Sequence, residues 1–233
     1  MNNKKAVILF SGGIDSTTAL YWAKQEFDPV YAMVVNYAQR HNIEVNMAQQ
    51  ITTQLKVETH VIQFPLKNIV SSALIDKEKE IPESLATSKN ETGIPYTYVP
   101  FRNGIFLSLA AAFAESREIF NIITGFNLID TPDYPDTTTA FTEKMEAAIN
   151  QGTSASITGK HFKIHTPLIG KSKKEIIRMG LELGADYSYS ISCYRGSEIP
   201  CLKCPSCDIR CNAFKQLNKE DPLITRLKKE GRL

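Results

Sequence analysis

Residues 11–16 read Ser11-Gly12-Gly13-Ile14-Asp15-Ser16, and they directly follow the apolar run Ala6-Val7-Ile8-Leu9-Phe10. This order predicts a strand, a glycine-rich turn and a helix. Backbone N–H groups and the positive end of the helix dipole then point at one spot, which suits a phosphate. The two glycines let the backbone approach an anion closely, because neither carries a Cβ. We therefore expect a phosphate-binding loop that comprises Phe10, Ser11, Gly12, Gly13, Ile14, Asp15, Ser16 and Thr17.

This glycine-rich loop differs from the two commonest phosphate loops. It lacks the lysine of a Walker A loop and the third glycine of a dinucleotide fingerprint. It resembles the SGGxDS loop of the PP-loop ATP pyrophosphatases. That resemblance implies that the loop holds the pyrophosphate half of ATP, and that the enzyme cleaves between the α and β phosphates. The alternative interpretation is a simple strand–turn–helix joint with a serine cap.

The composition limits the classes of partner. The chain has 233 residues, 42% of them hydrophobic, and a net charge of +2. That charge gives no electrostatic argument for a nucleic acid or a membrane as the main partner. The apolar runs are too short to cross a bilayer, and the first residues lack the apolar core of a signal peptide. We expect a cytoplasmic protein that acts on small molecules.

Strand-like and helix-like segments alternate along the chain, which predicts a doubly wound, mostly parallel α/β sheet of the PP-loop or HUP-like Rossmannoid type. The expected strands are Ala6–Phe10, Val30–Asn36, Val57–Phe64, Phe120–Gly125 and Phe162–Thr166. The expected helices are Asp15–Gln25, Ile43–Leu55, Asn103–Arg117, Thr139–Asn150 and Ser172–Gly184. Ligands of such sheets bind beyond the carboxyl ends of the strands, where the glycine-rich loop lies.

All five cysteines fall between residues 193 and 211. Cys193, Cys201, Cys204 and Cys207 have a spacing that suits a closed structural zinc site with four thiolates. In an alternative set Cys211 replaces Cys193, because a helix that starts near Pro205 would put Cys207 and Cys211 on one face. An iron–sulfur cluster is a further alternative. We expect a nucleotide-binding α/β domain over residues 1–185 and a zinc-binding lobe over residues 186–233 that packs on it.

Four more segments narrow the resemblance. They are Val99-Pro100-Phe101-Arg102-Asn103, Gly125-Phe126-Asn127 with Tyr134-Pro135-Asp136, His165-Thr166-Pro167-Leu168 with Ser172-Lys173-Lys174-Glu175-Ile176-Ile177, and Ser192-Cys193-Tyr194-Arg195-Gly196. Together with the loop and the cysteines they resemble the 7-cyano-7-deazaguanine synthase (QueC/ExsB) family over residues 5–217. The resemblance implies a homodimeric ligase of queuosine biosynthesis that uses ATP with Mg²⁺. Its substrate, 7-carboxy-7-deazaguanine, is adenylated, converted by ammonia to an amide, and dehydrated to the nitrile with further ATP.

The resemblance also implies catalytic roles for Asp15, Lys173 and Arg102. Lys173 would face the phosphates, Asp15 would act as an indirect Mg²⁺ partner, and Arg102, with Asn103 beside it, would clamp a carboxylate or phosphate. The plain alternatives are a solvated lysine, an acid in the first turn of a helix, and residues that merely start a helix.

A loop between two expected elements carries Asp130, Asp133 and Asp136. These aspartates would bind Mg²⁺ or the guanine-like edge of the substrate, or only form turns beside prolines. Thr137 and Thr138 follow where members of the family continue with cysteine and arginine, which leaves room for a shifted substrate.

Two other functions remain open. One is another PP-loop adenylating enzyme, either tRNA-modifying or amide-forming. The other is a zinc-bearing nucleotide-binding module that acts on RNA or protein, which the basic stretch Arg226-Leu227-Lys228-Lys229 motivates. A solvated surface explains these charges equally well.

Overall fold

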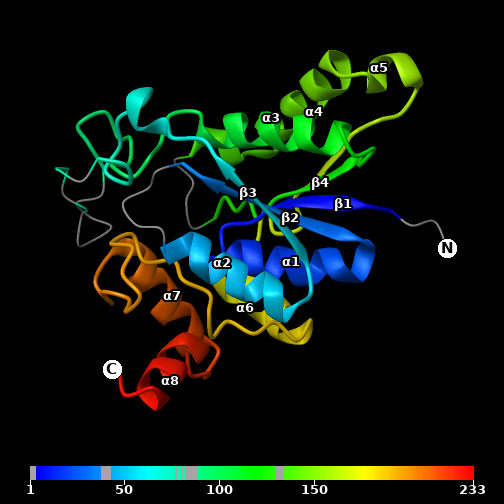
Figure 1. Cartoon of the computed structure of the whole chain (residues 1–233). Helices are drawn as coiled ribbons and strands as arrows, with labels where there is room; N and C mark the ends of the chain where they lie inside the picture. The colour runs from blue at the N-terminus through cyan, green and yellow to red at the C-terminus, as the bar shows by residue number, and fades with distance from the viewer. Residues whose placement is uncertain (1–3, 38–42, 77, 80, 82–88, 130–133) are drawn as a thin grey trace.

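A parallel sheet of five strands forms the centre of the chain (Figure 1). The computed structural model describes residues 4–37, 43–76, 78–79, 81, 89–129 and 134–233. The strands are β1 (Ala6–Leu9), β2 (Val30–Asn36), β3 (Glu58–Gln63), β4 (Asn121–Ile123) and β5 (Lys163–His165). They lie in the order β3-β2-β1-β4-β5, and every neighbouring pair is parallel. The chain order therefore reverses between β1 and β4.

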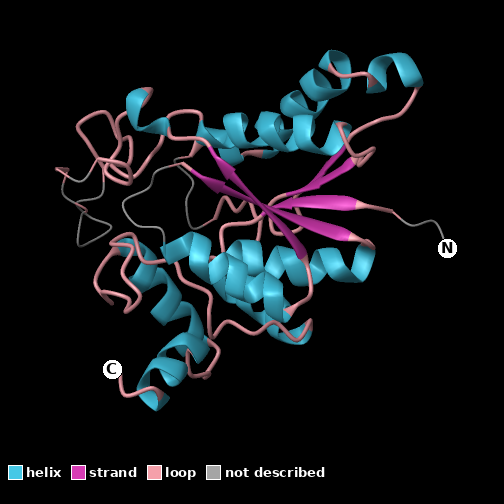
Figure 2. Ribbon diagram, in the orientation of Figure 1, coloured by secondary structure: helices cyan, strands magenta, loops and turns pink. Residues whose placement is uncertain are grey.

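Helices cover both faces of this sheet (Figure 2). The helices are α1 (Ile14–Glu26), α2 (Ile43–Gln54), α3 (Arg102–Glu115), α4 (Thr139–Gly152), α5 (Ala155–Thr158), α6 (Lys173–Glu182), α7 (Pro205–Gln216) and α8 (Pro222–Lys229), with short 3₁₀ turns η1 (Leu66–Asn68) and η3 (Pro135–Thr137). Helices α1, α2 and α6 lie on one face, and α3 and α4 lie on the other. The predicted doubly wound α/β fold is confirmed.

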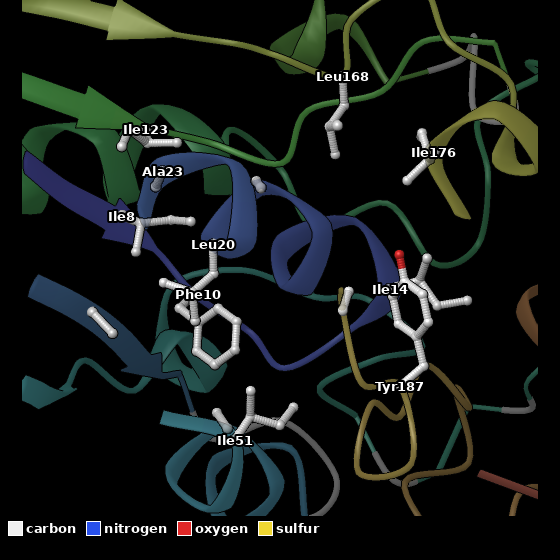
Figure 3. Close-up of a cluster of buried hydrophobic side chains, with 14 of the residues drawn as sticks. Ile8, Phe10, Ile14, Leu20, Ala23, Ile51, Ile123, Leu168, Ile176 and Tyr187 are labelled. Carbon is white, nitrogen blue, oxygen red and sulfur yellow. The ribbon is translucent and has the colours of Figure 1, made fainter. Parts of the chain in front are cut away.

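The apolar strands explain why both faces are covered. Successive side chains of a strand point to opposite faces, so a strand that is apolar throughout must be packed on both sides. In β1, Ala6 and Ile8 pack in the cluster with α1, α2 and α6, whereas Val7 packs in the cluster with α3 and α4. Figure 3 shows the first cluster, in which Leu20 lies near Ile8 and Ile51 lies on the far side of the Phe10 ring.

The C-terminal segment shares this core. Tyr187, from the segment after α6, and Phe214, from α7, lie in the same buried cluster as Ile8 and Ile176. The ring of Tyr187 packs edge-on against Phe214, with centroids 6.0 Å apart. The expected boundary between the domain over residues 1–185 and the lobe over residues 186–233 thus crosses one continuous apolar cluster. The division into these two parts stays a prediction. Within the described part of the chain, no helix combines the length and the apolar character that a bilayer crossing requires.

Candidate active site

The glycine-rich loop leads from β1 into α1 at the carboxyl edge of the sheet. Gly12 adopts a left-handed φ of 75°, which favours glycine. A Cβ on Gly12 would lie 3.1 Å from the backbone of Ala48, so the loop rests directly on α2. Gly13 is the N-cap of α1, and no side chain caps that helix. The hydroxyls of Ser11 and Ser16 lie 3.1 Å apart within the loop.

The segment after β4 closes the loop from its other side. A Cβ on Gly125 would lie 2.9 Å from the carbonyl carbon of Asp15 and from the nitrogen of Ser16. Only a residue without a side chain allows this approach between the two backbones. Because β1 and β4 flank the point where the strand order reverses, the first turn of α1 borders the crevice where doubly wound sheets bind ligands.

Lys173 and Asp15 form an ion pair beside the loop, although 158 residues separate them. The Lys173 Nζ donates to both carboxylate oxygens of Asp15, at 2.6 and 2.7 Å. A capping box fixes the start of α6, in which the side chains of Ser172 and Glu175 bond each other's backbone N–H groups. The ammonium group therefore lies beside the N-terminus of α1, where the Asp15 carboxylate balances its charge.

Arg102 and Asn103 lie at the N-terminus of α3, across from the loop. The backbone N–H of Asn103 donates to the Asp136 Oδ2 at 3.0 Å, which ties α3 to η3. The Arg102 Nη1 donates to the Tyr37 hydroxyl at 3.4 Å. Burial alone would lower the pKa of Arg102, but Tyr37, Tyr134 and Asp136 raise it, so the guanidinium stays charged. Burial also raises the pKa of Tyr37, which therefore remains a neutral hydroxyl.

These groups surround one cavity of about 350 Å³. Its wall includes Asp15, Lys173 and Arg102, together with Phe10, Ser11, Gly13, Ile14 and Ser16 of the predicted loop. The cavity therefore brings the three predicted catalytic residues together. Gly12 and Thr17 do not line it: Gly12 supports the loop from behind, and Thr17 is fully buried.

Only one of the three predicted aspartates, Asp136, lies among the described residues, and it does not line the cavity. Asp136 is 3% exposed, and it anchors the backbone of Asn103 rather than lining the cavity. Asp130 and Asp133 lie outside the described residues. Thr137, one of the two departures from the family pattern, lines the cavity, whereas Thr138 caps α4 by accepting from the Phe141 N–H at 3.1 Å.

Sequence reasoning assigned no role at the cavity to three aromatic side chains of its wall. They are Tyr37, Phe106 and Tyr194. The rings of Tyr37 and Phe106 lie 5.5 Å apart, and burial raises the pKa of Tyr194. Tyr194 belongs to a segment of the family resemblance, whereas only their positions after β2 and within α3 could have identified Tyr37 and Phe106. They provide the flat apolar surface that a heteroaromatic ligand requires.

The four cysteines predicted as metal ligands lie together. The sulfurs of Cys193, Cys201, Cys204 and Cys207 lie within 4.8 Å of one another, and Cys211 lies outside this group. Backbone N–H groups already donate to two of these sulfurs, at 3.4 Å for Cys193 and 3.3 Å for Cys201. Hydrogen bonds from Cys204 and Cys207 lower the pKa of Cys193, whereas the contact with Cys193 raises the pKa of both Cys204 and Cys207. The arrangement can hold a metal ion.

The cysteine group also touches the glycine-rich loop. Ile191 belongs to the buried cluster around the cysteines, together with Ile43 at the start of α2. The backbone N–H of Ile191 donates to the Gly12 carbonyl at 3.1 Å. One residue, Ser192, separates Ile191 from Cys193, so the cysteine group and the glycine-rich loop are close neighbours.

The strand order, the glycine-rich loop at the reversal point and the cavity beside it define an α/β protein of the PP-loop type. The family model described as "Queuosine biosynthesis protein QueC" matches residues 5–218, and the chain belongs to this family. The predicted family membership is therefore confirmed.

Similar sequences match nearly the full length of the chain. A 7-cyano-7-deazaguanine synthase of Persephonella marina is 44% identical over 220 residues, which cover 93% of this chain and 94% of that protein. One of Pseudomonas putida is 42% identical over 225 residues, which cover 95% and 98%. A solved 4-thiouridine synthetase–RNA complex with bound ATP superposes with a TM-score of 0.52 at 20% identity, over 98% of this chain and 53% of that chain. The latter similarity concerns the fold alone.

Proposed function

We propose that the chain is an ATP-dependent ligase that converts 7-carboxy-7-deazaguanine and ammonia to 7-cyano-7-deazaguanine. The observation that carries this proposal is the cavity, which joins a phosphate-type loop, a lysine and an arginine beside an aromatic wall. The full-length relatives named for this reaction support it. A carboxylate is a poor electrophile, so it must first receive an activating group. The residues around the cavity suit the transfer of an adenylyl group from ATP to this carboxylate.

The loop and Lys173 would act on the phosphates. Backbone N–H groups at the start of α1 bind the β and γ phosphates, and the substrate carboxylate attacks the α phosphate, which releases pyrophosphate and leaves an acyl adenylate. Lys173 lies where it can neutralise the charge that develops on the α phosphate. Asp15 holds Lys173 in place through the two hydrogen bonds and is positioned to bind the water shell of a Mg²⁺ ion. Mg²⁺ would supply further charge neutralisation on the phosphates.

Arg102 would orient the deazaguanine carboxylate. Its guanidinium stays charged, and its planar donors match a carboxylate. Ammonia then displaces AMP from the acyl adenylate and gives the amide. For the nitrile, the amide oxygen attacks the α phosphate of a second ATP and releases pyrophosphate. This oxygen then leaves with AMP, and the nitrogen gives up its two protons to solvent as the carbon–nitrogen triple bond forms. Positioning and charge stabilisation account for these steps without a side-chain nucleophile.

Zinc is the metal that we propose for the cysteine group. A tetrahedral site with zinc–sulfur bonds of about 2.3 Å separates its sulfurs by about 3.8 Å, and the Cys201 and Cys207 sulfurs lie 3.9 Å apart. Four thiolates leave no open position, so the ion would stabilise the lobe over residues 186–233 and take no part in the reaction. We also propose a cytoplasmic homodimer that acts without a nucleic-acid partner.

A single assay tests the function. The purified chain is incubated with 7-carboxy-7-deazaguanine, ammonium and Mg-ATP, and the products are read by mass spectrometry. We expect the amide at early times and the nitrile later, and neither product without ammonium. Failure to form either product in a preparation with its metal intact would refute the substrate assignment. ATP turnover that depends on added tRNA would instead favour a tRNA-modifying enzyme.

A further inference from the structure

Arg210 is a buried charge at the wall of the cavity to which the proposed chemistry assigns no role. It lies within α7, and its side chain is 4% exposed. Its Nε and Nη2 donate to the two carboxylate oxygens of Asp221, at 2.5 and 2.8 Å. The Asp221 carboxylate also caps α8 by accepting from the Leu223 N–H at 3.0 Å. The planar guanidinium is thus held at a fixed position by a bidentate partner.

The remaining donors of Arg210 reach the residues that follow α6. Nη1 donates to the Ser190 carbonyl at 2.8 Å, and Nη2 donates to the Tyr187 carbonyl at 3.4 Å. The Ser190 N–H also donates to the Tyr187 carbonyl, at 3.1 Å. We call residues 187–191 the anchor turn. Arg210 binds two carbonyls of this turn at once, which an ammonium group on a flexible stem cannot do with the same geometry.

The opposite side of the anchor turn contacts the glycine-rich loop and α1. The Ile191 N–H donates to the Gly12 carbonyl at 3.1 Å. The Tyr187 and Thr18 hydroxyls lie 2.6 Å apart, and the Thr18 hydroxyl donates to the Ile14 carbonyl at 3.0 Å. One turn of chain therefore connects the buried arginine to both sides of the predicted phosphate loop.

We propose that Arg210 is a positioning residue for ATP, because it holds the anchor turn that fixes the Gly12 peptide. Without the two bonds from Arg210, the turn loses its hydrogen bonds to α7 and keeps the packing of Tyr187 against Phe214, so the Gly12 carbonyl loses a rigid donor. The N–H groups that follow Gly12 must point at one anion, so their alignment depends on this peptide. This inference rests on the proposed function, since it assigns ATP to the loop.

The test compares two arginine-to-lysine variants of the full-length protein with its metal. Arg210→Lys keeps the charge opposite Asp221 but loses the planar fork. Arg117→Lys is the control, because Arg117 likewise donates to a backbone carbonyl, that of Phe113 at 3.4 Å, but lies just after α3 and away from the anchor turn. We expect Arg210→Lys to raise the KM for ATP about tenfold, the effect of losing one hydrogen bond to a charged group. The KM for the deazaguanine substrate and for ammonium stays within about twofold, as do all constants of Arg117→Lys.

Hydrogen exchange gives a second readout that involves no ATP. We expect faster exchange of the amides of residues 10–16 in Arg210→Lys, with unchanged protection of β3 and unchanged metal content. An ATP KM within about twofold of the parent, or unchanged exchange of residues 10–16, would overturn the proposal. Metal loss together with faster exchange in β3 would also overturn it, because the arginine would then be a general stabiliser. If the parent protein does not turn over ATP, the proposed function fails, whereas the exchange measurement still tests the anchor.

Discussion

The Gly125→Ala substitution tests how closely the segment after β4 must approach α1. An alanine Cβ at this position would lie 2.9 Å from backbone atoms of Asp15 and Ser16, whereas ordinary contacts begin at 3.4 Å. The two backbones must therefore separate by about 0.5 Å, and neither can rotate away as a side chain would. Overpacking of this kind costs about 1–3 kcal/mol of the free energy of unfolding. Since a displacement of about 1 Å at a reactive site costs about 100-fold in rate, half of it should cost about tenfold.

Gly152→Ala is the matched control, because a Cβ on Gly152 meets nothing within 4 Å. Urea unfolding measures the stability of both variants, and the rate of amide formation at subsaturating ATP measures the site. We expect the control to keep both values, or to gain up to about 1 kcal/mol of stability. The reasoning is refuted if Gly125→Ala unfolds at the same urea concentration as Gly152→Ala. It is also refuted if Gly125→Ala keeps the full kcat/KM for ATP.

Three further substitutions address the ion pair, the cysteines and a half-buried histidine. Lys173→Ala should lower the rate of adenylation by about 100-fold or more through loss of charge stabilisation. Lys174→Ala, on the same helix, should leave this rate unchanged. Equal rates of adenylation for the two variants would exclude the assigned role of Lys173. Elemental analysis of Cys201→Ala should show loss of bound zinc, and this variant should melt at a lower temperature. Cys211→Ala, outside the group of four, should keep its zinc and its melting temperature. Zinc retained in Cys201→Ala would contradict the assignment. Burial, aided by Lys163, lowers the pKa of His165, so the unfolded chain takes up a proton below about pH 6.5 more readily than the folded one. The free energy of unfolding should therefore fall on acidification below that pH, and urea titrations should show a smaller fall for His165→Asn; identical pH profiles would disprove this linkage.

The glycine-rich loop was predictable because local chemistry alone determines it. A continuous apolar run needs burial on both faces, and the glycines that follow it permit a conformation such as the left-handed φ of Gly12. The sequence also predicted α1, α2, α3, α4 and α6 to within a few residues. Apolar periodicity accounts for this in α4 and α6, whereas it is weak in α1 and α3, which follow the glycine-rich turn and the Arg102-Asn103 segment. The strands β4 and β5 are shorter than expected. Phe120 and Phe162 pack against each other, with ring centroids 5.2 Å apart, outside the strands.

Helix α8 was not predicted as an element, and α7 was considered only as a conditional helix starting near Pro205, where it does begin; the reason is chemical. The buried positions of α7 include Cys207 and Arg210, which a search for apolar side chains does not count. Arg210 finds its partner Asp221 only through the fold, so its burial leaves no local signal. The same holds for the Lys173–Asp15 pair, whose members are far apart in sequence. The resemblance to a family named both residues of this pair, but only the structure brings them together.

The hydrogen bond from Ile191 to Gly12 has a consequence for the order of events during synthesis. Strands β1, β2 and β3 are adjacent in the sheet and come from the first 63 residues, so the ribosome delivers this half of the sheet early. The cavity needs Gly125, Lys173 and Ile191 as well, and the last of these emerges after about four-fifths of the chain. A nascent chain therefore presents a glycine-rich loop long before it has a nucleotide site. Translation arrest before Ile191 would yield a fragment with the loop sequence and no completed pocket.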